Sequence, residues 1–106
     1  MMTALMLRTA AVAAMLAAPM LAQANLALAQ KNACMACHGV DKKVVGPAYQ
    51  DVAKKYAGQA DAQAKVEASI RAGGSGKWGA VPMPAQAQLS DADVKTLAAW
   101  ILSGAK

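Results

Sequence analysis

The chain has 106 residues and a formal net charge of +5, and it contains two cysteines, one histidine and no phenylalanine. The excess of positive charge is modest, which argues against nucleic acid as a partner. A small chain with so few large apolar side chains is only marginally able to stabilise itself by burial. We therefore expect one small domain whose core is completed by another component.

The first 24 residues have the layout of a secretory signal peptide. Arg8 is the only charge in this segment, residues 9–21 form an almost unbroken apolar run, and Ala22-Gln23-Ala24 is a small-x-small cleavage site. The alternatives are a membrane anchor or a buried helix. The apolar run is shorter than the roughly 20 residues that a bilayer span needs, so we expect the segment to be removed.

We expect cleavage after Ala24, which makes residues 25–106 the mature domain and leaves it outside the membrane. A second small-x-small site, Ala27-Leu28-Ala29, lies five residues further on. Cleavage there would leave too short a segment for a helix leading into the cysteines. Cleavage after Ala24 leaves Leu26, Gln30, Ala33 and Cys37 at helical intervals, which predicts one helix through this region.

Both cysteines and the only histidine lie in the string Cys34-Met35-Ala36-Cys37-His38. On a helix, positions i, i+3 and i+4 share one face, so the two thiols and the imidazole are expected to project together. C-x-x-C-H is the attachment signature of c-type haem. The cysteines would form thioethers with the two vinyl groups, and His38 would bind the iron as its proximal ligand.

Two other uses of the cysteines fit the sequence less well. A disulfide or redox-active pair is common in an oxidising compartment, but a thioredoxin-like pair needs a βαβ context, and the chain has no strand pattern nearby. Zinc needs four ligands, usually from two spaced pairs, and there is no second pair. The motif therefore predicts one covalent haem c, with its iron, per chain.

Two short helices are predicted after a loop that contains Gly39, Gly46 and Pro47. The first covers residues 48–56, with apolar positions at i, i+3, i+4 and i+7, and Gly58 ends it. The second covers residues 62–72 and begins after Asp61, which is expected to cap it.

The occupant of the sixth position of the iron separates an electron carrier from a ligand-binding haem protein. The chain has no second histidine, and five of its seven methionines lie in the first 20 residues. Met35 lies between the cysteines and cannot reach the opposite haem face. Met83 remains, held in an extended segment by Pro82 and Pro84. Taken alone, this Pro-Met-Pro segment would be interpreted as a surface turn; beside C-x-x-C-H, we expect Met83 to be the distal ligand.

The last predicted helix begins after Ser90, a favourable N-cap, with Asp91 and Asp93 in its first turn. Its apolar stripe comprises Val94, Leu97, Ala98 and Ile101, and Gly104 ends it. No alternating strand pattern occurs anywhere in the chain. The predicted fold class is all-α.

Three segments, "CMACHGVDKKVVGPAYQDVAKKYAGQ", "GKWGAVPMP" and "LSDADVKTLAAWILS", closely resemble the class I bacterial cytochromes c of the cytochrome c-551 type. The resemblance covers nearly all of residues 25–106 and implies four to five helices wrapped around one covalently attached haem, with the terminal helices crossing beside it. It also implies single-electron transfer in the periplasm between respiratory-chain proteins, by a monomer without substrate turnover.

The resemblance also implies roles for two further residues. Pro47 resembles the proline whose carbonyl accepts a hydrogen bond from the ligand histidine, and Trp78 resembles the tryptophan whose indole binds a haem propionate. Plain core packing is the alternative for Trp78, since a buried indole also needs an acceptor. Two departures, Ala85-Gln86 in place of Pro-Asn and Ser69 in place of arginine, concern the midpoint potential rather than ligation.

The expected partners are redox proteins that dock transiently at the haem edge. Four residues are a plausible apolar rim of this edge: Val44, Val45, Pro82 and Pro84. Lysines near these residues in the sequence, Lys42, Lys43 and Lys77, would steer an acidic partner. The alternative is that these lysines only make the surface soluble. A different class of function, a small peroxidase or ligand sensor, would need an open sixth position at the iron.

Overall fold

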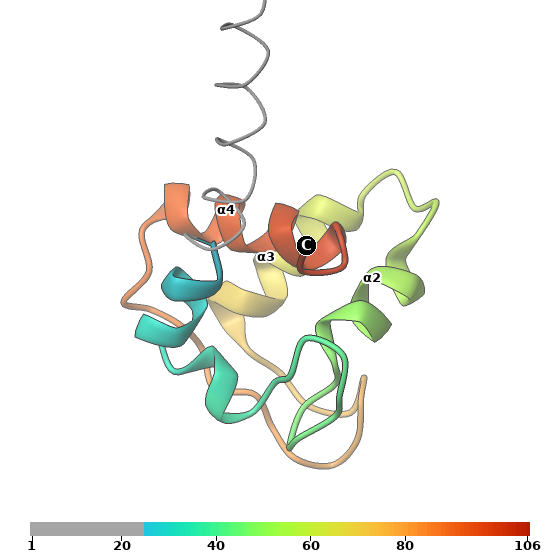
Figure 1. Cartoon of the computed structure of the whole chain (residues 1–106), viewed down its shortest axis with the longest axis horizontal. Helices are drawn as coiled ribbons and strands as arrows, with labels where there is room; N and C mark the ends of the chain where they lie inside the picture. Colours follow the sequence, from blue (N-terminus) through green and yellow to red (C-terminus); the bar gives the residue numbers. More distant parts are fainter. Residues whose placement is uncertain (1–24) are drawn as a thin grey trace, which may run out of the picture.

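The computed structural model describes residues 25–106, and the expected signal peptide lies outside the described residues. A helical segment at residues 25–31 is followed by η1 (Cys34–Ala36), α2 (Tyr49–Tyr56), α3 (Ala62–Ala72) and α4 (Asp91–Leu102) (Figure 1). Extended pairing within residues 25–106 is limited to two isolated bridges. The all-α prediction is confirmed. No helix of this part of the chain is long and apolar enough to cross a membrane.

The prediction of one helix running through the cysteines is wrong, because the chain breaks just before the motif. Asn32 donates its side-chain amide to the Leu28 carbonyl at 2.9 Å, which competes with continued helix formation. Ala33 then has the left-handed φ of 61°. A new 3-10 turn begins at Cys34, whose carbonyl accepts from the backbone N–H groups of Cys37 and His38 at 3.2 and 3.0 Å.

The two middle helices have the predicted positions. In α2, the buried residues are Tyr49, Val52 and Tyr56, and α3 has the predicted bounds. The expected side-chain cap by Asp61 is wrong. Its backbone lies at φ −101° and ψ 14° rather than in the extended region of an N-cap, and its carboxylate pairs with Lys65 at 3.4 Å instead.

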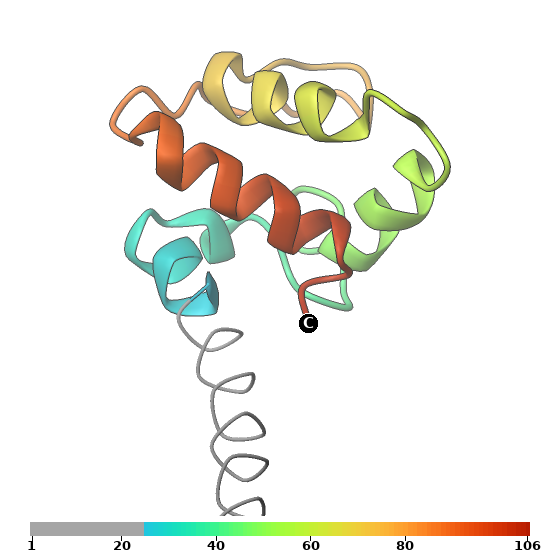
Figure 2. The same cartoon turned by 90° about the horizontal axis from the view of Figure 1, so that it is seen from above.

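Helix α4 forms the centre of the core and packs against both α2 and α3 (Figure 2). Its start follows the prediction, since the Asp93 N–H donates to Ser90 Oγ at 3.1 Å. Ala29 of the N-terminal helical segment is fully buried in the same core. The core members contributed by α4 are Val94, Leu97, Ala98, Trp100 and Ile101. The terminal segments therefore meet in one core, as the resemblance implies.

Candidate haem site

A cavity of about 520 Å³ lies among the motif, the loop after it, α3, α4 and the segment between these last two helices. That volume lies within the usual range of ligand and cofactor pockets. Its lining brings together the residues that sequence reasoning singled out: Cys34, Cys37, His38, Pro47, Trp78 and Met83. The rest of the lining includes apolar side chains of the core such as Val66, Ile70, Leu97 and Ile101.

The imidazole of His38 is fixed by contacts from the loop and from the first turn of α2. Its Nδ1 lies 2.8 Å from the Pro47 carbonyl oxygen. In the tautomer that donates from Nδ1 to this carbonyl, Nε2 keeps its lone pair and can bind a metal. A Cβ on Gly46 would lie 2.6 Å from His38 Cε1, so only glycine allows the loop to pass this close to the ring.

Tyr49 lies on the apolar face of α2, as its helical spacing predicts, but its contact with His38 had no signal in the sequence. Its ring stacks on the His38 imidazole, with centroids 5.0 Å apart and planes 19° apart. Its other neighbour is Trp100 of α4, which it meets edge-on at 5.5 Å. Burial, and then the nearby Cys34, raise the pKa of the Tyr49 phenol well above its ordinary value. Tyr49 thus joins the imidazole to the core.

Cys34 and Cys37 are free thiols, and both are half-buried at the cavity. Burial raises the pKa of the Cys34 thiol, and a hydrogen bond with Tyr49 opposes this shift. Because neither thiol is in a disulfide and both line the cavity, both sulfur atoms are available for thioether formation.

Met83 reaches the cavity from the segment between α3 and α4. We call residues 81–86 the methionine strap. The strap is paired with the end of α3: the Met83 N–H donates to the Gly74 carbonyl at 2.7 Å, and the Gly74 N–H donates to the Met83 carbonyl at 3.0 Å. Gly73 allows this approach, because a Cβ there would lie 2.3 Å from the Met83 carbonyl oxygen.

Trp78 lines the cavity and is 38% exposed, and its contact with a haem propionate stays a prediction. The ammonium of Lys55 lies 4.4 Å from the centre of its ring, a cation–π distance. Both departures reach the cavity, since Ser69 and Gln86 are among its lining residues. The Gln86 amide donates to the Pro84 carbonyl at 3.1 Å.

The residues at the cavity fit a haem better than a bare metal ion. Within residues 25–106, no group of three or more His, Cys, Asp or Glu side chains could hold a metal. An iron bound here must therefore take most of its ligands from a bound group, as haem iron takes them from the porphyrin. The donor set suits that arrangement, because an imidazole and a thioether are axial ligands of haem iron and paired thiols are its covalent anchors.

Comparison with known proteins agrees with this chemistry. The Cytochrome c family model matches residues 24–105. A cytochrome c-551 of Allochromatium vinosum is 54% identical over 81 residues, 76% of this chain and 86% of the relative. A cytochrome c-551 of Pseudomonas aeruginosa is 51% identical over 76 residues, 72% of each chain.

A solved structure shows the same fold. The crystal structure of Nitrosomonas europaea cytochrome c552 superposes with a TM-score of 0.73 at 52% identity, covering 74% of this chain and 98% of that one. The family match spans nearly all of the described domain, and the solved structure shares its fold. The chain belongs to the cytochrome c family, close to the bacterial cytochromes c-551 and c-552, and is an electron carrier with covalent haem c rather than an enzyme.

Proposed function

We propose that this protein is a periplasmic single-electron carrier whose haem iron is held between His38 and Met83. One observation carries the proposal: the two side chains line the same cavity although they come from distant parts of the sequence. Residues 1–24 would be the signal peptide, with cleavage after Ala24 and a mature, monomeric domain at residues 25–106.

Each site residue would have a defined task. Cys34 and Cys37 would hold the haem by adding their S–H groups across its two vinyl double bonds. The Pro47 carbonyl would accept the Nδ1 proton of His38 and so keep Nε2 directed at the iron. The haem supplies an iron that alternates between Fe(II) and Fe(III). The soft thioether of Met83 would favour Fe(II) and raise the midpoint potential.

The surface beside the cavity suits brief docking with a redox partner. Val44, Val45 and Val81 are 56%, 47% and 64% exposed, and Lys42, Lys43 and Lys77 are exposed near them in the sequence. Such a surface would attract an acidic protein by charge and release it quickly. We expect the rate of electron transfer to an acidic partner to fall as salt is added; a rate insensitive to salt would favour the solubilising role of the lysines.

Substitution of the two methionines of the described domain tests the distal ligand. We expect Met83→Ala to lose the weak far-red absorption band of sulfur-ligated ferric haem. The midpoint potential should fall by on the order of 0.1 V, since axial ligands set haem potentials over roughly 0.8 V. Met35→Ala is the matched control, because Met35 packs against the core and should keep both signals. A high-spin ferric spectrum of the parent would instead favour the peroxidase or sensor class.

Mass spectrometry of the protein purified from the periplasm tests export and attachment together. We expect an N-terminus at Asn25 and a mass that exceeds that of the polypeptide by one haem. A mass equal to that of the polypeptide alone would contradict covalent attachment.

A further inference from the structure

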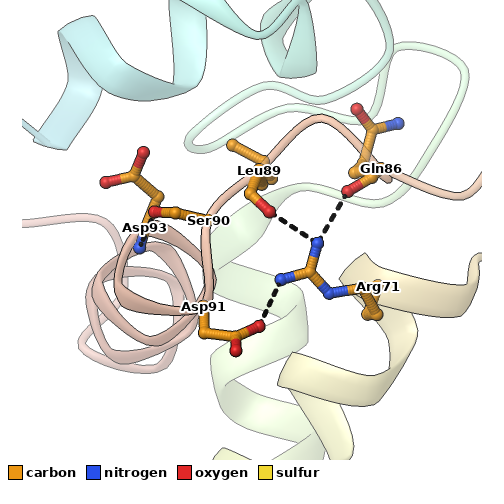
Figure 3. Close-up of polar contacts among 6 residues, drawn as sticks. All are labelled: Arg71, Gln86, Leu89, Ser90, Asp91 and Asp93. Atoms are coloured by element: carbon orange, nitrogen blue, oxygen red, sulfur yellow. Dashed lines mark hydrogen bonds and ion pairs between the residues drawn. The ribbon is translucent and has the colours of Figure 1, made fainter.

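Arg71, in the last turn of α3, makes three polar contacts with residues 86–91, which run from the end of the methionine strap to the first residue of α4 (Figure 3). Its Nη1 donates to the Leu89 carbonyl at 2.6 Å and to the Gln86 carbonyl at 3.3 Å. Its Nη2 donates to Asp91 Oδ1 at 2.8 Å. The sequence pattern indicated no role for Arg71.

These contacts need the shape of a guanidinium. Its planar fork directs two nitrogen atoms at separate acceptors, whereas the ammonium of lysine is a single point. The position also suits the charges, because a cation is favoured at the end of α3 and the Asp91 carboxylate at the start of α4. The Asp91 side chain is 94% exposed, and an exposed ion pair contributes little. The hydrogen bonds to the two carbonyls therefore carry most of the effect.

The segment that Arg71 holds is continuous with the ligand-bearing strap. The Gln86 N–H donates to the Ile70 carbonyl at 3.1 Å, and Met83 pairs with Gly74. The chain from Met83 to Asp91 is therefore fixed to the end of α3 at successive points. Gly74 holds its first part, and Arg71 holds the part that leads into α4. If the Arg71 contacts were lost, the Gln86–Ile70 bond would be the remaining hydrogen bond from that second part to α3, beside the packing of the buried Leu89 side chain in the core.

We propose that Arg71 is a positioning residue for the Met83 thioether, which it keeps at the iron by holding residues 86–91 against α3. The inference rests on the proposed function, because it takes Met83 as the distal ligand. It predicts that loss of Arg71 lets the strap open without unfolding the domain. An open strap would let an added ligand reach the iron.

Imidazole binding to the ferric haem protein measures this opening, since imidazole displaces the thioether and abolishes the far-red band. We expect Arg71→Gln to bind imidazole on the order of tenfold more tightly than the parent. Arg71→Lys should lie between the two, and Asp91→Asn should resemble the parent. Lys65→Gln is the matched control, because it removes the exposed Lys65–Asp61 pair at the other end of the same helix.

Amide hydrogen exchange in the ferrous protein separates positioning from general stability. We expect Arg71→Gln to accelerate exchange of the Met83 amide by about the same factor as it tightens imidazole binding. The exchange rate of the Ala98 amide, in the middle of α4, should not change. Acceleration at both amides to the same extent, or at neither, would overturn the inference. If the parent lacks the far-red band, the ligand proposal fails, while exchange at Met83 still decides whether Arg71 holds the strap.

Discussion

Substitution of Gly73 by alanine should displace the methionine strap more than alanine at the other glycines between α3 and α4. Gly73 follows α3 with φ 67° and ψ −160°, a region that is almost exclusive to glycine and costs other residues about 1–3 kcal/mol. An added Cβ would also lie 2.3 Å from the Met83 carbonyl oxygen and 2.8 Å from the Ala85 nitrogen. Both are backbone atoms, so no side-chain rotation relieves the overlap.

The size of the displacement follows from the contact distance. Ordinary van der Waals contact begins at 3.4 Å, so the Met83 carbonyl must move by about 1.1 Å from its 2.3 Å position. Its hydrogen bond with the Gly74 N–H is 3.0 Å long. A shift of that size away from Gly74 would break this bond. Overpacking of this kind costs about 1–3 kcal/mol. With the backbone term, we expect Gly73→Ala to lower the free energy of unfolding by about 2–6 kcal/mol.

Gly76→Ala is the matched control, because Gly76 also has a positive φ, 90°, but nothing lies within 4 Å of its added Cβ. Guanidinium unfolding of the haem protein, followed by far-UV circular dichroism, gives both free energies. The ferric far-red band reports whether the proposed Met83 ligand stays bound. Of the two variants, we expect only Gly73→Ala to weaken the band. Equal losses of stability in the two variants, with the band intact in both, would refute the argument from close approach.

Two further predictions concern the N-terminal break and the buried phenol. Ala33 has φ 61°, which costs an L-residue about 1–2 kcal/mol, more than the roughly 0.4–1 kcal/mol of added chain entropy that glycine brings. Ala33→Gly should therefore raise the free energy of unfolding by about 0.5–1 kcal/mol, and a fall in guanidinium unfolding would show that the turn is not strained. Because burial raises the pKa of Tyr49 in the folded state, its contribution to stability is complete below the ordinary pKa of about 10 and is lost as the pH rises further. Tyr49→Phe should lose less stability than the parent between neutral pH and pH values above about 10, and identical pH profiles would assign the alkaline loss to another group.

Helices α3 and α4 were predictable because their signals are local. Apolar residues repeat at the helical period in both, Gly73 and Gly104 mark the ends, and Ser90 accepts a hydrogen bond at the start of α4. The Asp61 cap failed for a reason that the residue type does not reveal. A cap needs an extended backbone at that position, and the preceding turn does not provide one.

The break before the haem motif shows the limit of periodicity. Leu26, Gln30, Ala33 and Cys37 repeat at helical intervals, yet the helix stops at Lys31. The local signal was Asn32, whose amide bonds back to the preceding turn and which is a residue type that competes with helix interiors. The helical spacing of side chains does not register this competing hydrogen bond, so the spacing alone predicts an unbroken helix.

The candidate site likewise combines residues that one short motif marks with residues that only the fold brings to the cavity. The C-x-x-C-H string is a short chemical signature, so the sequence alone indicated Cys34, Cys37 and His38 as haem residues. Met83 could be selected only by elimination, because the prolines beside it stiffen the strap without placing it. Its placement depends on Gly73 and Arg71, which act on backbone carbonyls of the strap and its continuation. Every residue has such a carbonyl, so no sequence pattern marks the acceptors. Substitutions at the end of α3 should therefore affect the thioether more than substitutions at exposed strap positions such as Val81, although Val81 is nearer to Met83 in the sequence.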